Sequence, residues 1–318
     1  MTDKQINKSL RRRFTEVGWV LVMYYCILSA LAMLGMFAEA GAQTLRRYRT
    51  GDWFSEYDVA AIAGNAWGYI FAILTGALIL HGWKGPEYWN REVLVKEKNM
   101  TAPVFGVMLC LCLGSQMVNS LWVSGLELVS NLFGTSLQPY LESVSGASDT
   151  FSMFLYASIL APIAEEVLFR GYVLRSLRPF GKRFAIFGSA LLFGLFHGNL
   201  LQGPYAFLMG LVLGYVTAEY SIGWSVALHL FNNLVLADLF TRLTANLPDV
   251  LYNILSLLLL GGGAVASLVI LIHKRQEIRD YNRSEWMDRR VLKCFFTNSG
   301  IHVLTVLMLV NILLYLPW

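Results

Sequence analysis

Charged residues are scarce in this chain of 318 residues. Only 14% of the residues are Asp, Glu, Lys or Arg, whereas 56% are apolar or aromatic, and the mean hydropathy is +0.53. A soluble domain usually carries about a quarter charged residues, and no polar stretch in this sequence is long enough to form one. The shortage of charge therefore argues against a soluble protein and predicts an all-α fold, a polytopic bundle of membrane helices.

Several patterns with well-known chemistry are missing. There is no Gly-x-Ser-x-Gly elbow of a serine hydrolase and no His-Glu-x-x-His helix of a zinc peptidase. The net charge of +4 is small and its basic residues gather in loops, so no nucleic-acid partner is expected. The first apolar run is too long for a signal peptide and is predicted to be a membrane anchor. The four cysteines show neither metal-cluster nor disulfide spacing: Cys26, Cys110, Cys112 and Cys294.

Long apolar runs take the place of the missing polar domains. A spanning helix needs roughly 20 mostly apolar residues, and nine runs qualify, so we predict eight or nine transmembrane helices. The fifth and sixth runs are short and are expected to be buried in protein. The nine candidates are 17–38, 60–82, 102–126, 150–169, 184–200, 204–219, 223–240, 250–272 and 296–316.

The distribution of Lys and Arg predicts the orientation. The loops at 83–101, 170–183 and 273–295 are rich in both, which places them and the N-terminus in the cytoplasm. The expected location is the cell membrane. The segment 127–149 has acidic residues but no Lys or Arg, and a short interfacial helix is expected within it. The loop predicted at 41–58 disagrees, because it would lie outside yet contains Arg46, Arg47 and Arg49.

Two adjacent acids and an arginine interrupt the apolar run 151–177. Glu166 and Arg170 have the i, i+4 spacing of a helical ion pair in its favourable order. Glu165 diverges from Glu166 by about 100° around a helix, so it has no local charged partner and is a candidate general base acting on water. Ionisable groups inside a membrane usually mark a function. The alternative is that all three mark the cytoplasmic end of a span.

Three further polar residues follow in apolar surroundings. His197 ends the stretch Phe193-Gly-Leu-Phe-His197, and His229 and Asn233 share one helical face at i, i+4 spacing, whereas Asn232 is rotated away from that face. Two donors on one face match the needs of a developing oxyanion. The alternatives are a hydrogen-bonded core histidine at His197 and an interhelical hydrogen bond from His229 or Asn233.

Taken together, the three motifs are similar to those of a known family. Glu165-Glu166-x-x-x-Arg170, Phe193-x-x-x-His197 and His229-x-x-x-Asn233 occur in the order found in the CAAX-protease and bacteriocin-processing (Abi-type) intramembrane glutamate proteases. This family is related to the type II CAAX prenyl endopeptidase. The resemblance covers about residues 150–240 and implies a catalytic core there. The flanks 1–149, with the interfacial segment, and 241–318 are predicted to add transmembrane helices.

The resemblance implies a role for each motif residue. Glu165 is expected to activate a water that His197 helps to hold, and His229 and Asn233 are expected to stabilise the oxyanion. Glu166 and Arg170 are expected to support the helix. The implied enzyme is a metal-independent endopeptidase without a cofactor. Its implied substrate is a membrane-associated peptide or protein, prenylated or a peptide precursor, that it meets in the lipid bilayer.

Two other functions fit the same residues. A zinc-dependent protease could use Glu165, His197 and His229 as ligands, and a non-hydrolytic membrane protein (an immunity factor, a scaffold or a small transporter) could use them as a polar relay. The predicted span boundaries place Glu165 and Arg170 near the cytoplasmic end of their helix. They place His197 toward the opposite end of its short span, although the enzyme hypothesis requires these residues to converge.

Overall fold

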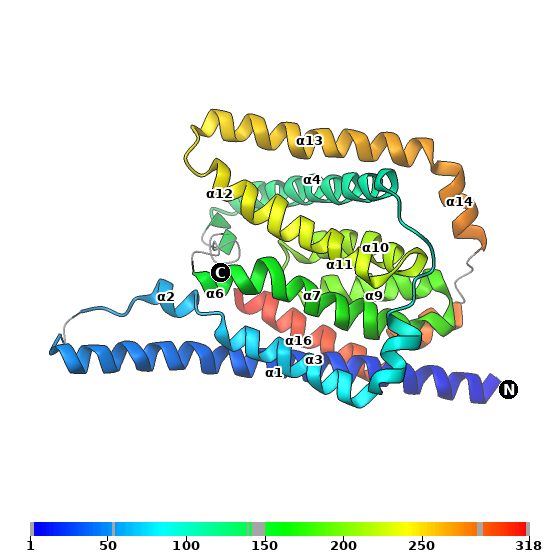
Figure 1. Cartoon of the computed structure of the whole chain (residues 1–318), viewed down its shortest axis with the longest axis horizontal. Helices are drawn as coiled ribbons and strands as arrows, with labels where there is room; N and C mark the ends of the chain where they lie inside the picture. Colours follow the sequence, from blue (N-terminus) through cyan, green and yellow to red (C-terminus); the bar gives the residue numbers. More distant parts are fainter. Residues whose placement is uncertain (1–2, 53–54, 139, 142–149, 285–288, 316–318) are drawn as a thin grey trace.

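The chain is all-α over the residues that the structure describes. The computed structural model describes residues 3–52, 55–138, 140–141, 150–284 and 289–315, and these contain helices and no strand. Most long helices run along a common direction in a layered bundle, with α1 (Asp3–Thr50) on one outer face and α13 (Asp249–His273) on the other (Figure 1). The predicted class, a polytopic α-helical bundle, is therefore confirmed.

The N-terminal part begins with one very long helix. A candidate span occupies 43 residues of α1, from Lys8 to Thr50, and such a helix is about 65 Å long, twice the thickness of the hydrocarbon core. Arg46, Arg47 and Arg49 therefore lie in a helix and not in the loop predicted at 41–58. The next elements are α2 (Val59–Ala63), α3 (Trp67–Tyr88), the π-helical η1 (Trp89–Val93) and α4 (Ala102–Leu132). Of the segment 127–149, in which a short interfacial helix is expected, residues 127–132 belong to α4, and 139 and 142–149 lie outside the described residues.

The acidic motif lies in one continuous helical segment, Phe151–Phe180. Its stretches are α6 (Phe151–Phe154), η2 (Leu155–Leu160), α7 (Ala161–Glu165), η3 (Glu166–Leu174), α8 (Arg175–Leu177) and η4 (Arg178–Phe180), of which η2 and η3 are π-helical. Pro162 has no N–H to donate, and the helix leaves α-geometry just before it. The span predicted to end at residue 169 continues as a helix to Phe180. Arg170 and Arg175, which suggested a membrane interface, lie within this helix.

A tight reversal follows this segment. Gly181 has φ 116°, a conformation that favours glycine, and α9 (Lys182–Phe196) then runs back along η3. The remaining motif elements are α10 (Gly203–Glu219), α11 (Ile222–Leu230), the π-helical η5 (Phe231–Leu239) and α12 (Phe240–Thr244). After α13 the chain forms α14 (Arg275–Ser284), α15 (Arg289–Phe296) and α16 (Ser299–Tyr315).

Six helical segments of the described chain are long and apolar enough to cross a membrane, and a seventh exists if α15 and α16, bent by 56°, form one span. The count of eight or nine is not confirmed. The difference lies in α9 and α10, which have 15 and 17 residues and fall short of the roughly 20 that a bilayer requires. Both pack against each other inside the bundle, which agrees with the expectation that these two runs are buried in protein.

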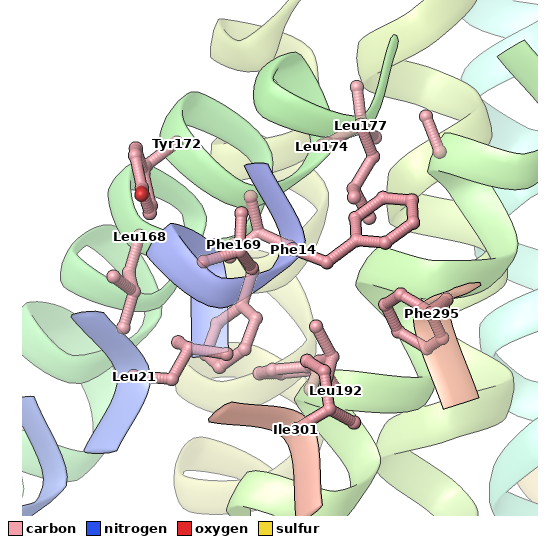
Figure 2. Packing of buried hydrophobic residues seen from close by; sticks show 14 of the residues in the cluster. Phe14, Leu21, Leu168, Phe169, Tyr172, Leu174, Leu177, Leu192, Phe295 and Ile301 are labelled. Carbon is pink, nitrogen blue, oxygen red and sulfur yellow. The ribbon is translucent and has the colours of Figure 1, made fainter. Parts of the chain in front are cut away.

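Helices from both ends of the chain enclose the motif segment. Phe14 of α1 packs edge-on against Phe295 of α15, with ring centroids 5.5 Å apart, and Leu21 and Ile301 join them beside Phe169 (Figure 2). The close approach of α1 and α16 depends on glycine, since a Cβ at Gly18 would lie 2.5 Å from the backbone of Gly300. The terminal helices therefore form part of the core that holds the motifs.

At one end of the bundle, a charged cluster around Glu219, the last residue of α10, joins several helices. Lys182 and Lys98 donate to its two carboxylate oxygens over 2.7 and 2.9 Å, and Tyr281 of α14 donates over 3.2 Å. Burial alone raises the pKa of the Glu219 carboxyl, but the lysine hydrogen bonds outweigh burial and hold that pKa below its usual range. This cluster joins the loop before α4 to α9, α10 and α14.

Candidate functional site

The centre of the site is an ion pair with no access to solvent. Glu166 Oε1 lies 3.0 Å from Arg170 Nη1, and both side chains are 0% exposed. The pair has the predicted i, i+4 spacing, since both residues belong to η3. Arg170 also donates from Nη2 to Gly210 O at 3.4 Å and lies over the Phe193 ring at 4.4 Å. A buried charge needs such partners, so Arg170 belongs to the interior of the bundle and not to an interface.

Two side chains from α11 complete the shell of Glu166. Ser225 Oγ makes a short hydrogen bond to Glu166 Oε2, and His229 Nδ1 lies 2.9 Å from Glu166 Oε1. These two residues are one helical turn apart at i, i+4 and therefore face the same side of α11. Because Arg170 keeps Glu166 charged, the carboxylate accepts, and His229 carries its Nδ1 proton. Glu166 thus joins η3 to α11 and fixes the orientation of the imidazole.

Glu165 has a different environment from its neighbour. Its side chain is 30% exposed, and its Oε2 lies 3.7 Å from Nε2 of His229, too far for a direct hydrogen bond. The structure describes no ion pair between Glu165 and a residue of its own helix, in agreement with the prediction. The imidazole of His229 therefore lies between the two acids, bonded to Glu166 through one nitrogen and facing Glu165 with the other.

The depth of the site differs from the prediction. Glu165 lies near the middle of the segment Phe151–Phe180 and not close to its end. His197 follows the last residue of α9 and is as many residues beyond the Gly181 turn as Glu165 is before it. In an antiparallel helix pair, residues equidistant from the turn lie at one level. Phe169 and Phe193, also equidistant from Gly181, have ring centroids 5.0 Å apart, which fixes this register.

His197 is linked to the site through the ring of Phe193, which contacts both His197 and His229. Phe193 packs edge-on against His197 at 4.8 Å and against His229 at 6.0 Å between ring centroids. His197 Nδ1 lies 2.9 Å from Phe193 O. A carbonyl oxygen only accepts, so Nδ1 is the protonated nitrogen and Nε2 is left as an acceptor in the neutral ring. The hydrogen bonds of the described residues include none between His197 and Glu165.

Asn233 lies on η5, one turn beyond His229. Its Nδ2 donates to Ala157 O in η2 over 3.2 Å, and its Oδ1 accepts from Asn232 Nδ2 over 3.0 Å. The interhelical hydrogen bond considered from the sequence is thus present for both residues, to Ala157 from Asn233 and to Glu166 from His229. One hydrogen of the Asn233 amide remains without a protein acceptor among the described residues.

The structure also brings in residues that sequence reasoning missed. Ser225 was not predicted, because a single serine in an apolar helix does not by itself indicate a function. Its i, i+4 spacing to His229 was the one feature of the sequence that could have identified it. Asn232 was set aside as rotated off the His229 face, yet it is buried and bonded to Asn233. Gln116 and Tyr205, which bond Asn232, come from α4 and α10 and could not be placed without tertiary structure.

The donor arrangement does not match a metal centre. Among the described residues, no group of three or more His, Cys, Asp and Glu side chains is placed to share an ion, and this includes Glu165, His197 and His229. His229 Nδ1 is already engaged by Glu166. The zinc-ligand set considered from the sequence therefore receives no support from the positions of these side chains.

Fold and site together define a polytopic helical membrane protein with a buried Glu–Arg–His cluster in its interior. The model of the family described as "Rce1-like: Type II CAAX prenyl endopeptidase Rce1-like" matches residues 147–235. All six predicted site residues fall within this match. This segment is therefore similar to the type II CAAX prenyl endopeptidase family, in agreement with the resemblance of the motifs. Searches of curated proteins and of solved structures gave no match.

Proposed function

We propose that this protein is an intramembrane endopeptidase in which Glu165 activates the attacking water. The observation that carries the proposal is the contrast between the two acids. Glu166 is fully buried and bonded by Arg170, Ser225 and His229, so it has no capacity left to accept a proton from water. Glu165 is 30% exposed and 3.7 Å from His229 Nε2, which leaves its carboxylate accessible beside a fixed imidazole.

The separation of 3.7 Å between Glu165 Oε2 and His229 Nε2 places a water bound to the carboxylate beside the nitrogen that is assigned below to the oxyanion. His197 presents an acceptor nitrogen from the same level of the bundle, because its Nδ1 proton is directed to Phe193 O. These positions support a water that donates to Glu165 and His197 and turns its oxygen lone pair toward a carbonyl carbon.

The oxyanion is assigned to His229 and Asn233. With its Nδ1 proton directed to Glu166, His229 in its imidazolium form offers a second N–H at Nε2. The Asn233 amide has one hydrogen beyond the one that Ala157 O accepts. Donors fixed in place before the reaction stabilise developing charge without reorganisation. Both donors are held by bonds on their far sides, His229 by Glu166 and Asn233 by Asn232.

The proposed reaction proceeds in two balanced steps. The water oxygen forms a bond to the scissile carbonyl carbon while Glu165 takes a water proton, and the carbonyl electrons move to the oxygen held by His229 and Asn233. The C–N bond then breaks, and the leaving nitrogen receives the proton from Glu165. Since general acid–base catalysis of this kind contributes about 10²–10⁴ in rate, loss of the Glu165 carboxylate is expected to remove most activity. No metal takes part in this scheme.

The proposed substrate is a membrane-associated peptide or protein, with prenylated C-terminal peptides as the first class to test. The name of the matched family supports this class, and the site lies at mid-depth of a spanning segment. We also propose a cell-membrane location with the N-terminus in the cytoplasm. Support comes from the basic segment α14, which lies at the same end of the bundle as the N-terminus (Figure 1).

The test uses purified full-length protein in lipid nanodiscs and a quenched fluorescent peptide ending in a prenylated cysteine and three further residues. Glu165→Gln is expected to lower kcat by at least about 10²-fold, while Glu87→Gln, an exposed glutamate on α3, retains wild-type turnover. Comparing peptide termini in membranes from cells with wild-type protein or Glu165→Gln extends the test to unprenylated substrates. Equal peptide cleavage and equal termini in both samples would refute the proposal and favour a non-hydrolytic protein.

A further inference from the structure

A chain of hydrogen bonds joins α4, α10 and η5 and passes through Asn233 to its last acceptor, Ala157 O. Gln116 Nε2 of α4 donates to Tyr205 OH over 3.2 Å and to Asn232 Oδ1 over 2.8 Å. Tyr205 OH of α10 donates to the same Asn232 oxygen over 2.8 Å. Asn232 Nδ2 donates to Asn233 Oδ1, and Asn233 Nδ2 donates to Ala157 O. Four polar side chains from three separate regions of the sequence thus share one directed path.

The direction of this chain is set by its last member. Ala157 O is a backbone carbonyl that can only accept, so Asn233 must turn its NH₂ group toward it. The Asn233 oxygen then faces Asn232, which must offer its own NH₂ group. The Asn232 oxygen is left facing Gln116 and Tyr205, and both of these side chains can donate. One acceptor therefore determines the amide orientation of every residue before it.

We propose that Gln116, Tyr205 and Asn232 are positioning residues that hold the Asn233 amide with its free N–H directed at the reacting carbonyl oxygen. This inference rests on the proposed function, because it assigns the chain a task in stabilising the oxyanion. Hydrogen bonds in a row polarise one another, so donation into the Asn233 oxygen strengthens its N–H groups as donors. The chain prevents the amide from flipping, which would turn an oxygen toward the oxyanion.

The burial of the chain supports this role. Asn232 is 3% exposed, and a single interhelical hydrogen bond would satisfy one amide group there. Its oxygen instead receives two donors while its nitrogen serves the neighbouring residue. The chain reaches its backbone acceptor, Ala157 O, through Asn233, the residue that the family motif places beside the reaction.

The decisive variant is Asn232→Asp, which keeps the shape and the oxygen that accepts from Gln116 and Tyr205. It replaces the donor to Asn233 by an acceptor, so the Asn233 amide is repelled in the catalytic orientation. Loss of an oxyanion donor lowers kcat by about 10²–10³-fold, and a misaligned donor is expected to lower it by about 10–100-fold, with KM changed by less than about twofold. Tyr205→Phe is expected to have a smaller effect on kcat, because Gln116 still donates to Asn232.

Two controls separate positioning from loss of structure. Ser267→Ala removes a comparable interhelical bond, from Ser267 Oγ of α13 to Cys110 O of α4, and is expected to leave kcat unchanged. The second control does not depend on activity. In protein labelled with ¹⁵N-asparagine, the side-chain amide of Asn233 is expected to exchange with solvent about tenfold faster in Asn232→Asp than in wild type, with its signals identified from Asn233→Ala.

The outcomes are distinguishable from a failure of the proposed function. If Glu165→Gln cleaves as wild type does, the proposed function fails, and the amide exchange of Asn233 still tests the hydrogen-bond chain. If Glu165→Gln is inactive while Asn232→Asp keeps full kcat, the inference is overturned and the protease remains. An equal loss of kcat in Ser267→Ala and Asn232→Asp, or unchanged exchange of the Asn233 amide, also overturns it.

Discussion

The buried ion pair Glu166–Arg170 allows a matched test of how much an ion pair contributes inside the bundle. The perturbations are Glu166→Gln, Arg170→Met and the double variant. Gln keeps one oxygen that can accept from His229, and its NH₂ group can donate to Ser225 Oγ, which still donates to Leu213 O, so Glu166→Gln removes mainly the charge. The chain offers a control in Glu87 and Arg91, which have the same spacing, the same atoms and the same 3.0 Å separation but are 74% and 77% exposed.

The expected magnitudes differ because of burial. Removing one partner of a buried pair leaves an uncompensated charge and typically costs about 3–5 kcal/mol, and both Glu166 and Arg170 are 0% exposed. The double variant removes both charges and is expected to be more stable than Glu166→Gln, in which Arg170 stays buried alone. Exposed i, i+4 pairs contribute about 0.3–0.5 kcal/mol, so the cycle at Glu87 and Arg91 should give a coupling energy close to zero.

The assay is reversible unfolding of the full-length protein from mild detergent by increasing SDS, followed by tryptophan fluorescence. The coupling energy comes from the free energies of unfolding of wild type, both single variants and the double variant. A coupling of several kcal/mol at Glu166–Arg170 against a small value at Glu87–Arg91 is expected. If the two cycles give the same coupling energy, Glu166 and Arg170 do not form the buried ion pair described above, and Glu166 does not fix the orientation of His229.

Three further predictions concern pH, packing and metals. The pKa of Glu219 is lowered in the folded protein, so its stabilisation is present above the ordinary carboxyl pKa of about 4.3 and is lost as pH falls through the folded value. The thermal midpoint of Glu219→Gln should therefore vary less between pH 7 and pH 4 than that of wild type. Gly18→Ala is expected to destabilise by about 1–3 kcal/mol through overpacking against α16, whereas Gly41→Ala on the same helix, with nothing within 4 Å, should be neutral or stabilising in the same unfolding assay. Peptide cleavage should survive dialysis against a strong chelator, and loss of activity that zinc restores would contradict the proposed metal-free scheme.

Local spacing was enough to predict part of the site. The i, i+4 order of Glu166 and Arg170 fixes their pairing because both lie on one helix, whose geometry brings such residues together. The same reasoning left Glu165 without a partner on its own helix. Spacing gives the wrong end for this helix, because an arginine at position 170 is also typical of a membrane interface. A buried arginine with a paired carboxylate does not end a helix, and the segment continues to Phe180.

Contacts between different helices could not be predicted from spacing along the sequence. The level shared by Glu165 and His197 depends on the turn at Gly181, and nothing in the motif spacing specified that α9 is a 15-residue helix folded back on η3. The predicted count of spanning helices is not confirmed for the same reason. Two apolar runs that looked like spans are short internal helices, because neighbouring helices and not lipid bury them.

Composition and apolar runs determined the class of fold of this protein from the sequence alone, and three ordered motifs predicted the family similarity that residues 147–235 show. These features are local or additive along the chain, so they do not depend on packing. Only the tertiary structure decided that His229 lies between the two acids, that Ser225 bonds Glu166, and that Gln116 and Tyr205 bond Asn232 beside Asn233. Such contacts depend on the register of separate helices, which local spacing does not specify.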